Sequence, residues 1–299
     1  MKFGIFVFGD NHPELGRSNQ KYYQEVLTLA EWAEDLGFDS FWLGEHHLYW
    51  YGTCVSPPMV IAALAQRTKK IRLGPAVAVP SFHNPLVLAE EYAFADNLCG
   101  GRLEFALGSG FSPVEFKTFG MTMEEAKERF WEATDVILKA WAQEEFSHEG
   151  KYYHYDNATL YVKPVQKPMP PIWLAASSDE TLVKAGQLGW PMMGIPFARS
   201  NNLLDVKVKN DLYKDYYVSP AIGQSQTSWS LCTCICMRMR EKLPGSAVPT
   251  STASPHSPRR TVDRDRRSPI STSSSERASL SSLLHRKRKR SSGNMRKPA

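Results

Sequence analysis

The chain has 299 residues, a formal net charge of +5, and contents of hydrophobic (42%) and charged (22%) residues that are ordinary for a soluble globular protein. No stretch approaches the ~18 apolar residues of a membrane-spanning helix, and the apolar run Met1–Phe8 ends too early for a signal peptide. Five Cys residues without a disulfide framework fit a reducing compartment, so we expect a cytoplasmic protein.

Strands and helices alternate through the first part of the chain. The apolar run 2–8 predicts a strand, and the helical spacing of apolar residues over 22–36, stopped by Gly37, predicts a helix. Thr122 and Glu125 form a capping box at the start of a long helix. The remaining expected elements are strands at 38–43, 71–79 and 102–107 and helices at 57–66, 85–98 and 123–141.

Residues 144–170 interrupt the alternation with several Tyr and Pro residues, which predicts a surface hairpin. Beyond it we expect strands at 172–175 and 191–195 and helices at 179–188 and 203–217. About six βα units with short connections indicate an α/β fold with a parallel sheet. Because no Gly-rich phosphate fingerprint follows the first strand, we favour an incomplete (β/α)8 barrel over a Rossmann sheet.

The composition changes after Tyr217, and we call residues 218–299 the basic tail. The first part holds 20 Lys+Arg and 27 Asp+Glu, a net charge of −7, whereas the basic tail holds 16 and 4, a net charge of +12. All 14 Phe and all 12 Tyr lie in the first part, and 18 Ser lie in the tail. Such a segment buries too little apolar surface to offset its ordering entropy, so we expect a truncated barrel over 1–217 and a disordered tail.

Polar residues follow the second strand at Glu45-His46-His47. In a barrel this position is the C-terminal mouth, where catalytic groups sit. One of the two His residues can face the cavity as a general base while the other packs or pairs with Glu45. The alternative is a pair of satisfied His residues at the start of a loop. His83, after the third strand, would line the same mouth.

Two further segments have the composition of ligand-binding turns. Gly108-Ser109-Gly110 lets the backbone approach a flat ring or a phosphate, although a simple tight turn fits as well. Ser178 and Thr181 lie at the start of an expected helix and could bind an anion, although an ordinary Ser N-cap is the alternative. The run Cys232, Cys234 and Cys236 lacks a nearby His and suits a tetrahedral site poorly, so we expect no metal site.

Together these segments resemble the bacterial luciferase-like, flavin-dependent monooxygenase family from residue 1 to about residue 217. The most recognisable match is Leu36–His47, with sequence LGFDSFWLGEHH. Further matches are the opening Met1–Phe6, the strand Gly101–Gly110 and the approach Pro164–Trp173. The resemblance implies a (β/α)8 barrel, usually dimeric, that binds reduced FMN at its C-terminal mouth.

The resemblance also implies roles for single residues. His46 lies where luciferases place the His that assists flavin chemistry. Ala76 and Val77 fall where the third strand lies against the isoalloxazine, often through a cis peptide, and Gly108 and Ser109 fall on the flavin-lining end of the fourth strand.

The remaining implied sites are a phosphate site and a substrate pocket. Ser177, Ser178 and Thr181 fall on the phosphate site. Glu45, His47 and His83 would line the substrate pocket. The chain departs from the family at Ser109, where luciferases carry a phosphate-binding Arg.

The implied chemistry is monooxygenation. Reduced FMN, supplied by a separate flavin reductase, reacts with O2 to give a C4a-peroxyflavin, which oxidises an aldehyde, alkane, sulfonate or similar small molecule in a dry cavity. One alternative is a deazaflavin-dependent oxidoreductase on the same barrel, which transfers hydride without O2. A second is a non-catalytic binding protein whose basic tail, with Arg286–Arg290, binds nucleic acid.

The basic tail has two interpretations. It is either a natural disordered segment or the product of out-of-frame translation that begins near 218–224, and we favour the second. With GC-rich codons assumed, residues 227–241 read in another frame encode an alternating strand of the kind that the next barrel unit needs. A barrel without its last two units leaves two parallel edges unpaired, so we expect the chain to aggregate or to be inactive.

Overall fold

The computed structural model describes residues 2–50, 52–194, 203–218, 232–233 and 235–236. The chain divides into two units, Met1–Arg240 and Glu241–Ala299, and the second lies outside the described residues. The expected basic cluster Arg286–Arg290 therefore lies outside them as well. In the described part, no helix is long and apolar enough to cross a membrane.

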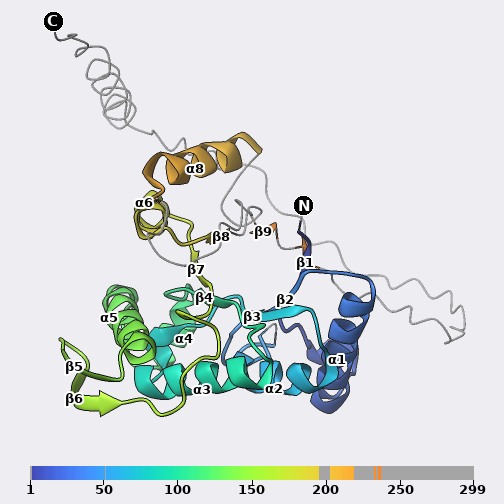
Figure 1. Ribbon diagram of the computed structural model, residues 1–299. Helices are drawn as coiled ribbons and strands as arrows, with labels where there is room; N and C mark the ends of the chain where they lie inside the picture. Colours follow the sequence, from blue (N-terminus) through green and yellow to red (C-terminus); the bar gives the residue numbers. More distant parts are fainter. Residues whose placement is uncertain (1, 51, 195–202, 219–231, 234, 237–299) are drawn as a thin grey trace, which may run out of the picture. The chain divides into compact units, whose positions relative to one another are not determined.

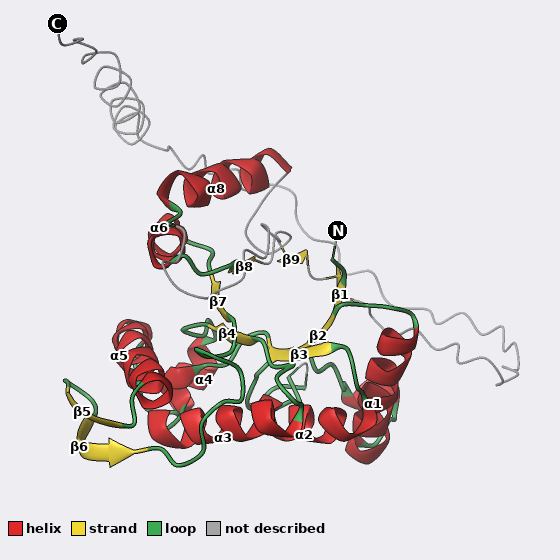
Figure 2. Ribbon diagram, in the orientation of Figure 1, coloured by secondary structure: helices red, strands yellow, loops and turns green. Residues whose placement is uncertain are grey.

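Six parallel strands form the framework of the first unit, as expected from the alternating pattern (Figure 2). They pair in chain order, and isolated parallel bridges at Leu73–Leu103 and Ala78–Leu107 join the third strand to the fourth. The strands are β1 (Gly4–Val7), β2 (Ser40–Leu43), β3 (Arg72–Pro75), β4 (Phe105–Leu107), β7 (Ile172–Ala175) and β8 (Met192–Gly194). All carboxyl ends consequently point to one end of the sheet, which is the mouth of a barrel.

The two outer edges of this sheet are paired by a short segment of the basic tail. β9 (Cys232–Thr233) pairs in parallel with β8, and β10 (Ile235–Cys236) pairs in parallel with β1. Our expectation that both edges stay unpaired is therefore wrong, because two residues on each side supply the missing backbone partners. These four residues are also strand where we expected disorder, and the rest of the tail after Val218 lies outside the described residues.

Helices cover the outer face of the strands, and in Figure 1 α1, α2 and α3 lie along β1, β2 and β3. Four of the helices are capped by side chains that accept backbone N–H groups of the first turn, namely those of Ser18, Asn84, Thr122 and Ser178. Of the capping box predicted at Thr122, the bond accepted by the Thr122 side chain is confirmed. The helices are α1 (Asn19–Asp35), α2 (Pro57–Arg67), α3 (Pro85–Leu98), α4 (Pro113–Thr118), α5 (Met123–Ala142), α6 (Asp179–Leu188) and α8 (Leu203–Tyr216), with short 3-10 turns η1 (Pro13–Leu15) and η2 (Pro80–Phe82).

Successive residues of each strand face two different environments. Ile5 packs in the large cluster between sheet and helices, whereas Phe6 belongs to a small inner cluster with Trp42, Ala106 and Met193. This alternation follows from the two-residue period of a strand, and it fills the barrel interior with side chains. The inner cluster also contacts Phe8, Ala76, Val77 and Trp173, so the packed interior continues up to the mouth.

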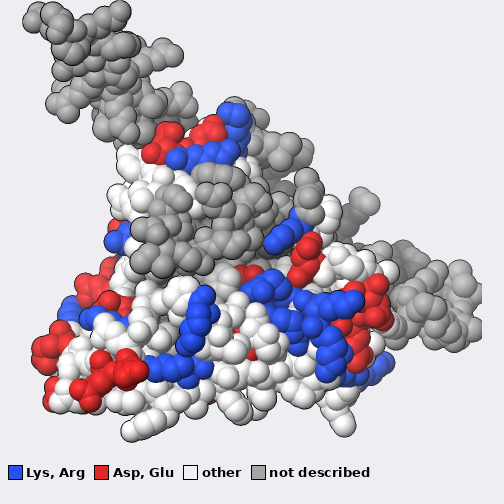
Figure 3. Space-filling model, viewed as in Figure 1, with Lys and Arg blue, Asp and Glu red and all other residues white. Residues whose placement is uncertain are grey.

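The expected hairpin is present as β5 (Glu145–Glu149) and β6 (His154–Thr159), which pair antiparallel. Glu132 of α5 holds its turn by accepting the backbone N–H groups of Lys151, Tyr152 and Tyr153. On the surface in Figure 3, Lys and Arg side chains lie interspersed with Asp and Glu over the described residues. The described body therefore shows both signs of charge side by side, which is ordinary for a folded surface.

Candidate functional site at the carboxyl ends of the strands

His46 lies buried at the mouth, two residues beyond the start of the loop that follows β2, with 7% of its surface exposed. Its Nδ1 atom lies 3.3 Å from Oε1 of Glu115, which is itself buried. The ring centroids of Phe8 and Phe111 lie 4.9 and 5.4 Å from that of the imidazole. The imidazole is thus held between two aromatic rings and a carboxylate.

Backbone passes directly over His46 at Gly52. A Cβ atom at that position would collide with Cβ of His46, far inside the closest approach of two carbon atoms that are not bonded to each other. Only glycine allows the loop after β2 to fold back this closely. The same loop is anchored by the backbone N–H of His46, which donates to the carbonyl of Cys54 at 3.2 Å.

Glu45 is fully buried and connects three groups of the mouth. Its Oε1 atom lies 2.7 Å from Nε2 of His83 and 3.4 Å from Nε2 of His47, and its Oε2 atom accepts the backbone N–H of Val79 at 3.2 Å. Burial by itself raises the pKa of the Glu45 carboxyl, but the hydrogen bonds to His47 and His83 outweigh it and hold that pKa below its usual value. The expected pairing of one His with Glu45 is confirmed for His47.

His47 and His83 differ in their surroundings. The ring of His47 stands edge-on to Phe82 and Phe119, with ring centroids 5.9 and 5.2 Å away. The rings of Phe82 and Phe119 stack on each other with their centroids 4.7 Å apart. His83 is more accessible, and its pKa lies above the usual value because the bond to Glu45 outweighs the opposing effect of burial.

The ends of β3, β4 and β7 form a surface of small residues, which we call the ledge. The peptide bond Ala76–Val77 is cis, as the resemblance implied. A Cβ atom on Gly108 would lie 2.5 Å from Cγ2 of Val77 and 3.3 Å from Cβ of Ala175, so the three strand ends touch at this glycine. Ser109 follows on the same ledge and is half-buried. A larger residue at 108 would push these strand ends apart.

The start of α6 lies at the same end of the sheet, directly after β7. Ser177 and Ser178 are exposed, and Oγ of Ser178 accepts the backbone N–H of Thr181 at 3.3 Å and lies 2.9 Å from its hydroxyl. The expected N-cap is therefore confirmed at Ser178. Asp179 and Glu180 occupy the first turn, so any anion held here would approach two carboxylates.

The sequence analysis missed Glu115, which lies in the short helix α4. Besides contacting His46, its Oε1 atom accepts the backbone N–H of His47 at 2.7 Å. Ser112 caps α4 through the backbone N–H of Glu115 and lies 2.8 Å from the hydroxyl of Tyr49. The signal was Ser112-Pro113-Val114-Glu115, a capping-box pattern that predicts a helix start and a fixed Glu.

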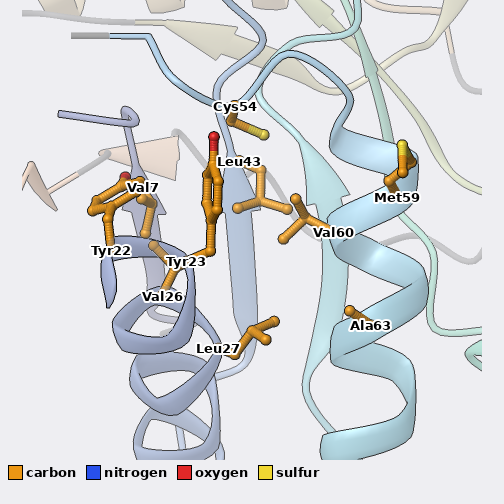
Figure 4. A pocket seen from close by; sticks show the side chains of 10 residues that line it. All are labelled: Val7, Tyr22, Tyr23, Val26, Leu27, Leu43, Cys54, Met59, Val60 and Ala63. Carbon is orange, nitrogen blue, oxygen red and sulfur yellow. The ribbon is translucent and has the colours of Figure 1, made fainter. Parts of the chain in front are cut away.

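An apolar cavity of about 160 Å³ lies between α1 and α2 and the outer faces of β1 and β2 (Figure 4). Figure 4 shows Tyr22 and Tyr23 on one side of it and Met59 on the other. None of the site residues predicted from the sequence lines it. The structure thus brings Glu45, His46, His47 and His83 together at the mouth, and places the ledge and the α6 start at the same end of the strands.

The luciferase-like monooxygenase family model matches residues 1–203, which is most of the described chain. The chain belongs to the luciferase-like monooxygenase family. Its members compared below are oxidoreductases. The solved structure of the monooxygenase RslO1 from Streptomyces bottropensis is 33% identical, superposes with a TM-score of 0.68, and the match covers 72% of this chain and 65% of that one.

Two curated relatives of the family use different cofactors according to their names. The oxygenase component of a flavin-dependent trigonelline monooxygenase from Acinetobacter baylyi is 31% identical, over 62% of this chain and 52% of that protein. An F420-dependent glucose-6-phosphate dehydrogenase from Amycolatopsis mediterranei is 32% identical, over 56% of this chain and 51% of that protein. The chain spans about half the length of the curated relatives it matches.

Proposed function

We propose that the chain carries the flavin-side half of a monooxygenase site, which uses reduced FMN and O2 through a C4a-peroxyflavin to oxidise a small aldehyde, alkane, sulfonate or similar molecule. The observation that carries the proposal is the buried His46–Glu115 pair, enclosed by aromatic rings, at the mouth of the strands. Such a pair provides a positioned proton-transfer group in a site with little water.

Glu115 acts in this proposal through His46. A carboxylate at Nδ1 favours the tautomer with hydrogen on that atom, so that Nε2 carries the lone pair. His46 then accepts or returns a proton at Nε2 while its ring stays fixed between Phe8 and Phe111. Glu115 is a positioning residue, and the second bond that it makes, to the backbone of His47, keeps its own oxygen in place.

The ledge fits a flat ring system. Gly108 offers no side chain, and Ala76 and Val77 are small and only partly buried, so a tricyclic isoalloxazine can lie against the strand ends. In the proposal, Ala76, Val77, Gly108 and Ser109 contact that ring. Bound reduced FMN would supply the activation of O2, and the protein would supply placement and exclusion of water.

The hydroxyl groups at the start of α6 fit a phosphate less well than the ledge fits a flat ring. Ser177, Ser178 and Thr181 offer donors at a helix N-terminus, which attracts anions. Asp179 and Glu180 oppose this attraction, although Lys127 pairs with Glu180 at 2.6 Å and offsets part of its charge. We propose that these three hydroxyl residues hold the FMN phosphate, with modest affinity because Ser109 replaces an Arg.

The remaining parts of the proposal concern substrate and partners. Glu45, His47 and His83 would border the substrate pocket. A separate flavin reductase would supply reduced FMN, which is consistent with the name of the trigonelline relative as an oxygenase component. We also propose a homodimer and a cytoplasmic location, the latter because Cys54 and Cys99 are free thiols.

A second candidate function is F420-dependent hydride transfer on the same ledge. The observation in its favour is the F420-dependent relative, whose identity to this chain matches that of the flavin-dependent one. A flavin and a deazaflavin share their ring shape, so the ledge alone does not choose between them. The His46–Glu115 pair serves either chemistry, because oxidation of an alcohol by hydride transfer also releases a proton, so binding of the two cofactors has to be compared directly.

Anaerobic titration of the full chain with reduced FMN, and separately with reduced F420, tests the proposal through quenching of the tryptophan fluorescence of the protein. We expect saturable binding of reduced FMN that is tighter than that of F420. Gly108→Val should weaken it at least about tenfold because the added side chain collides with Val77.

Gly16→Asn serves as the control, since its φ of +60° suits Asn and its Cβ would meet nothing within 4 Å. Tighter binding of F420, or equal FMN binding by the Gly108 variant, would contradict the proposal.

A further inference from the structure

Three potential metal ligands converge on one point beside His46. Glu45, His47 and His83 each offer one ligand atom, and these atoms all lie within 4.8 Å of one another. Glu45 and His47 come from the loop after β2, whereas His83 directly follows η2, so the fold joins residues that lie far apart in sequence. Two imidazoles and one carboxylate form a donor set that binds Zn²⁺ and related divalent transition metals in proteins.

We propose that Glu45, His47 and His83 form a binding site for a single divalent transition-metal ion, with Zn²⁺ as its representative. The cysteine run predicts no metal site, and the meeting of His83 with Glu45 and His47 depends on the fold and has no local sequence pattern. The new proposal does not depend on flavin chemistry, since it concerns only these three side chains and their neighbours.

Two of the three distances between ligand atoms lie near those around a small cation, and the third, between the nitrogens of His47 and His83, is within 4.8 Å. Tetrahedral zinc with bonds of about 2.0–2.2 Å keeps neighbouring ligand atoms about 3.3 Å apart. Nε2 of His47 already lies 3.4 Å from Oε1 of Glu45. Nε2 of His83 lies 2.7 Å from the same oxygen and would have to retreat by about 0.6 Å, a motion open to a side chain with 28% of its surface exposed.

Surrounding groups fix the ligands in the way that outer contacts fix them in known metal sites. The backbone N–H of Val79 holds Oε2 of Glu45, which leaves Oε1 directed at the two imidazoles. The stacked rings of Phe82 and Phe119 hold the imidazole of His47 edge-on. The cluster is therefore organised before any ion binds, and less conformational freedom is lost on binding.

Charge and access also favour a cation. With both imidazoles neutral, Glu45 leaves the cluster negatively charged, and Glu115 adds a second carboxylate at the backbone of His47. Glu45 has only 1% of its side chain exposed, whereas His47 and His83 have 15% and 28%, so an ion enters from the imidazole side. Water can occupy the fourth position on that side, as in zinc sites with three protein ligands.

The test uses the full chain, stripped with a chelator and titrated with Zn²⁺ against a chromophoric competitor, and with Co²⁺ as a spectroscopic probe. We expect one Zn²⁺ per chain and weak visible Co²⁺ bands without the strong sulfur charge-transfer band of a thiolate site. His83→Gln removes a ligand and should lower the Zn²⁺ affinity about 100-fold, because even the loss of a group that only hydrogen-bonds to a metal ligand lowers affinity about 10- to 100-fold.

His154→Gln is the control, because His154 is exposed on the hairpin and pairs only with Glu149 among the interactions described. It should bind Zn²⁺ as the unchanged chain does. Circular dichroism confirms that the His83 variant is folded; if it is not, His47→Gln replaces it.

Three outcomes overturn the proposal. The first is no Zn²⁺ binding at millimolar concentrations, which would mean that the cluster is an ion-pair network alone. The second is unchanged affinity in the folded His83 or His47 variant. The third is a Co²⁺ spectrum with thiolate bands, which would place the ion on cysteine. None of these results bears on whether the chain binds FMN, so the two proposals fail separately.

Discussion

Replacing Glu115 by alanine removes the group that holds both histidines of the mouth. Its Oε1 atom lies 3.3 Å from Nδ1 of His46 and accepts the backbone N–H of His47 at 2.7 Å; Glu115 and His46 are buried and His47 is half-buried. A broken hydrogen bond to a charged group costs about 1.5–3 kcal/mol. For two such contacts, one of them long, we expect Glu115→Ala to lower the free energy of unfolding by about 3–5 kcal/mol.

Glu115→Gln should cost less, about 1–2 kcal/mol, because the amide oxygen can still accept the N–H of His47. The assay is equilibrium unfolding of the full chain in urea, followed by tryptophan fluorescence. Glu144→Ala is the control, since Glu144 is an exposed loop residue and should change the midpoint little.

A double-mutant cycle with His46→Ala separates the coupling of the pair from the general loss of packing. We expect a coupling free energy of about 1 kcal/mol or more between His46 and Glu115. The reasoning is refuted if Glu115→Ala costs less than about 1 kcal/mol, or if the two substitutions are strictly additive.

Three further predictions concern other parts of the chain. Glu34→Gln should destabilise the protein by about 1 kcal/mol near neutral pH, after allowance for solvent screening, because the carboxylate accepts backbone N–H groups up to Ile71. Burial raises the pKa of Glu34, but the bonds to the backbone outweigh it and lower that pKa below 4.5. The difference in free energy of unfolding between the variant and the unchanged chain should therefore vanish as the pH falls through the folded-state pKa. A difference that stays constant down to strong acid would count against this explanation. Gly52→Ala should displace His46 and lower the thermal midpoint by several degrees, as measured by calorimetry, and an unchanged midpoint would show that the loop yields freely. Sequencing the gene in independent isolates should reveal a frame change near codons 218–224, whereas an intact frame in all of them would end the out-of-frame interpretation.

The spacing of apolar residues and the residues at helix ends predict most of the strands and helices. Apolar spacing and Pro or Gly at the ends locate α2 and α3 within a residue of their observed bounds, and the capping box locates α5. The third strand is shorter than expected, since it ends at Pro75 with one further bond, from the backbone N–H of Ala76 to Leu43. The helix α4 was missed because six residues are too few to show a helical period.

The chemistry of the mouth was only partly predictable. Position after a strand identifies Glu45, His46 and His47, because barrel strands end at the mouth. Which His meets which carboxylate depends on Glu115 and His83, which arrive from distant loops, and no local pattern specifies those distances. The pairing of residues 232–233 and 235–236 with the two sheet edges is non-local in the same sense, and the composition of the tail gave no sign of it.

The central claim is that this mouth supports oxygen chemistry on a reduced flavin. The most direct measurement mixes the full chain, loaded anaerobically with reduced FMN, with O2 in a stopped-flow spectrophotometer. We predict a transient absorbing species, distinct from both reduced and oxidised FMN, that precedes oxidised FMN and decays faster in His46→Ala. Oxidation in a single step at the rate of free reduced FMN in buffer would contradict the account.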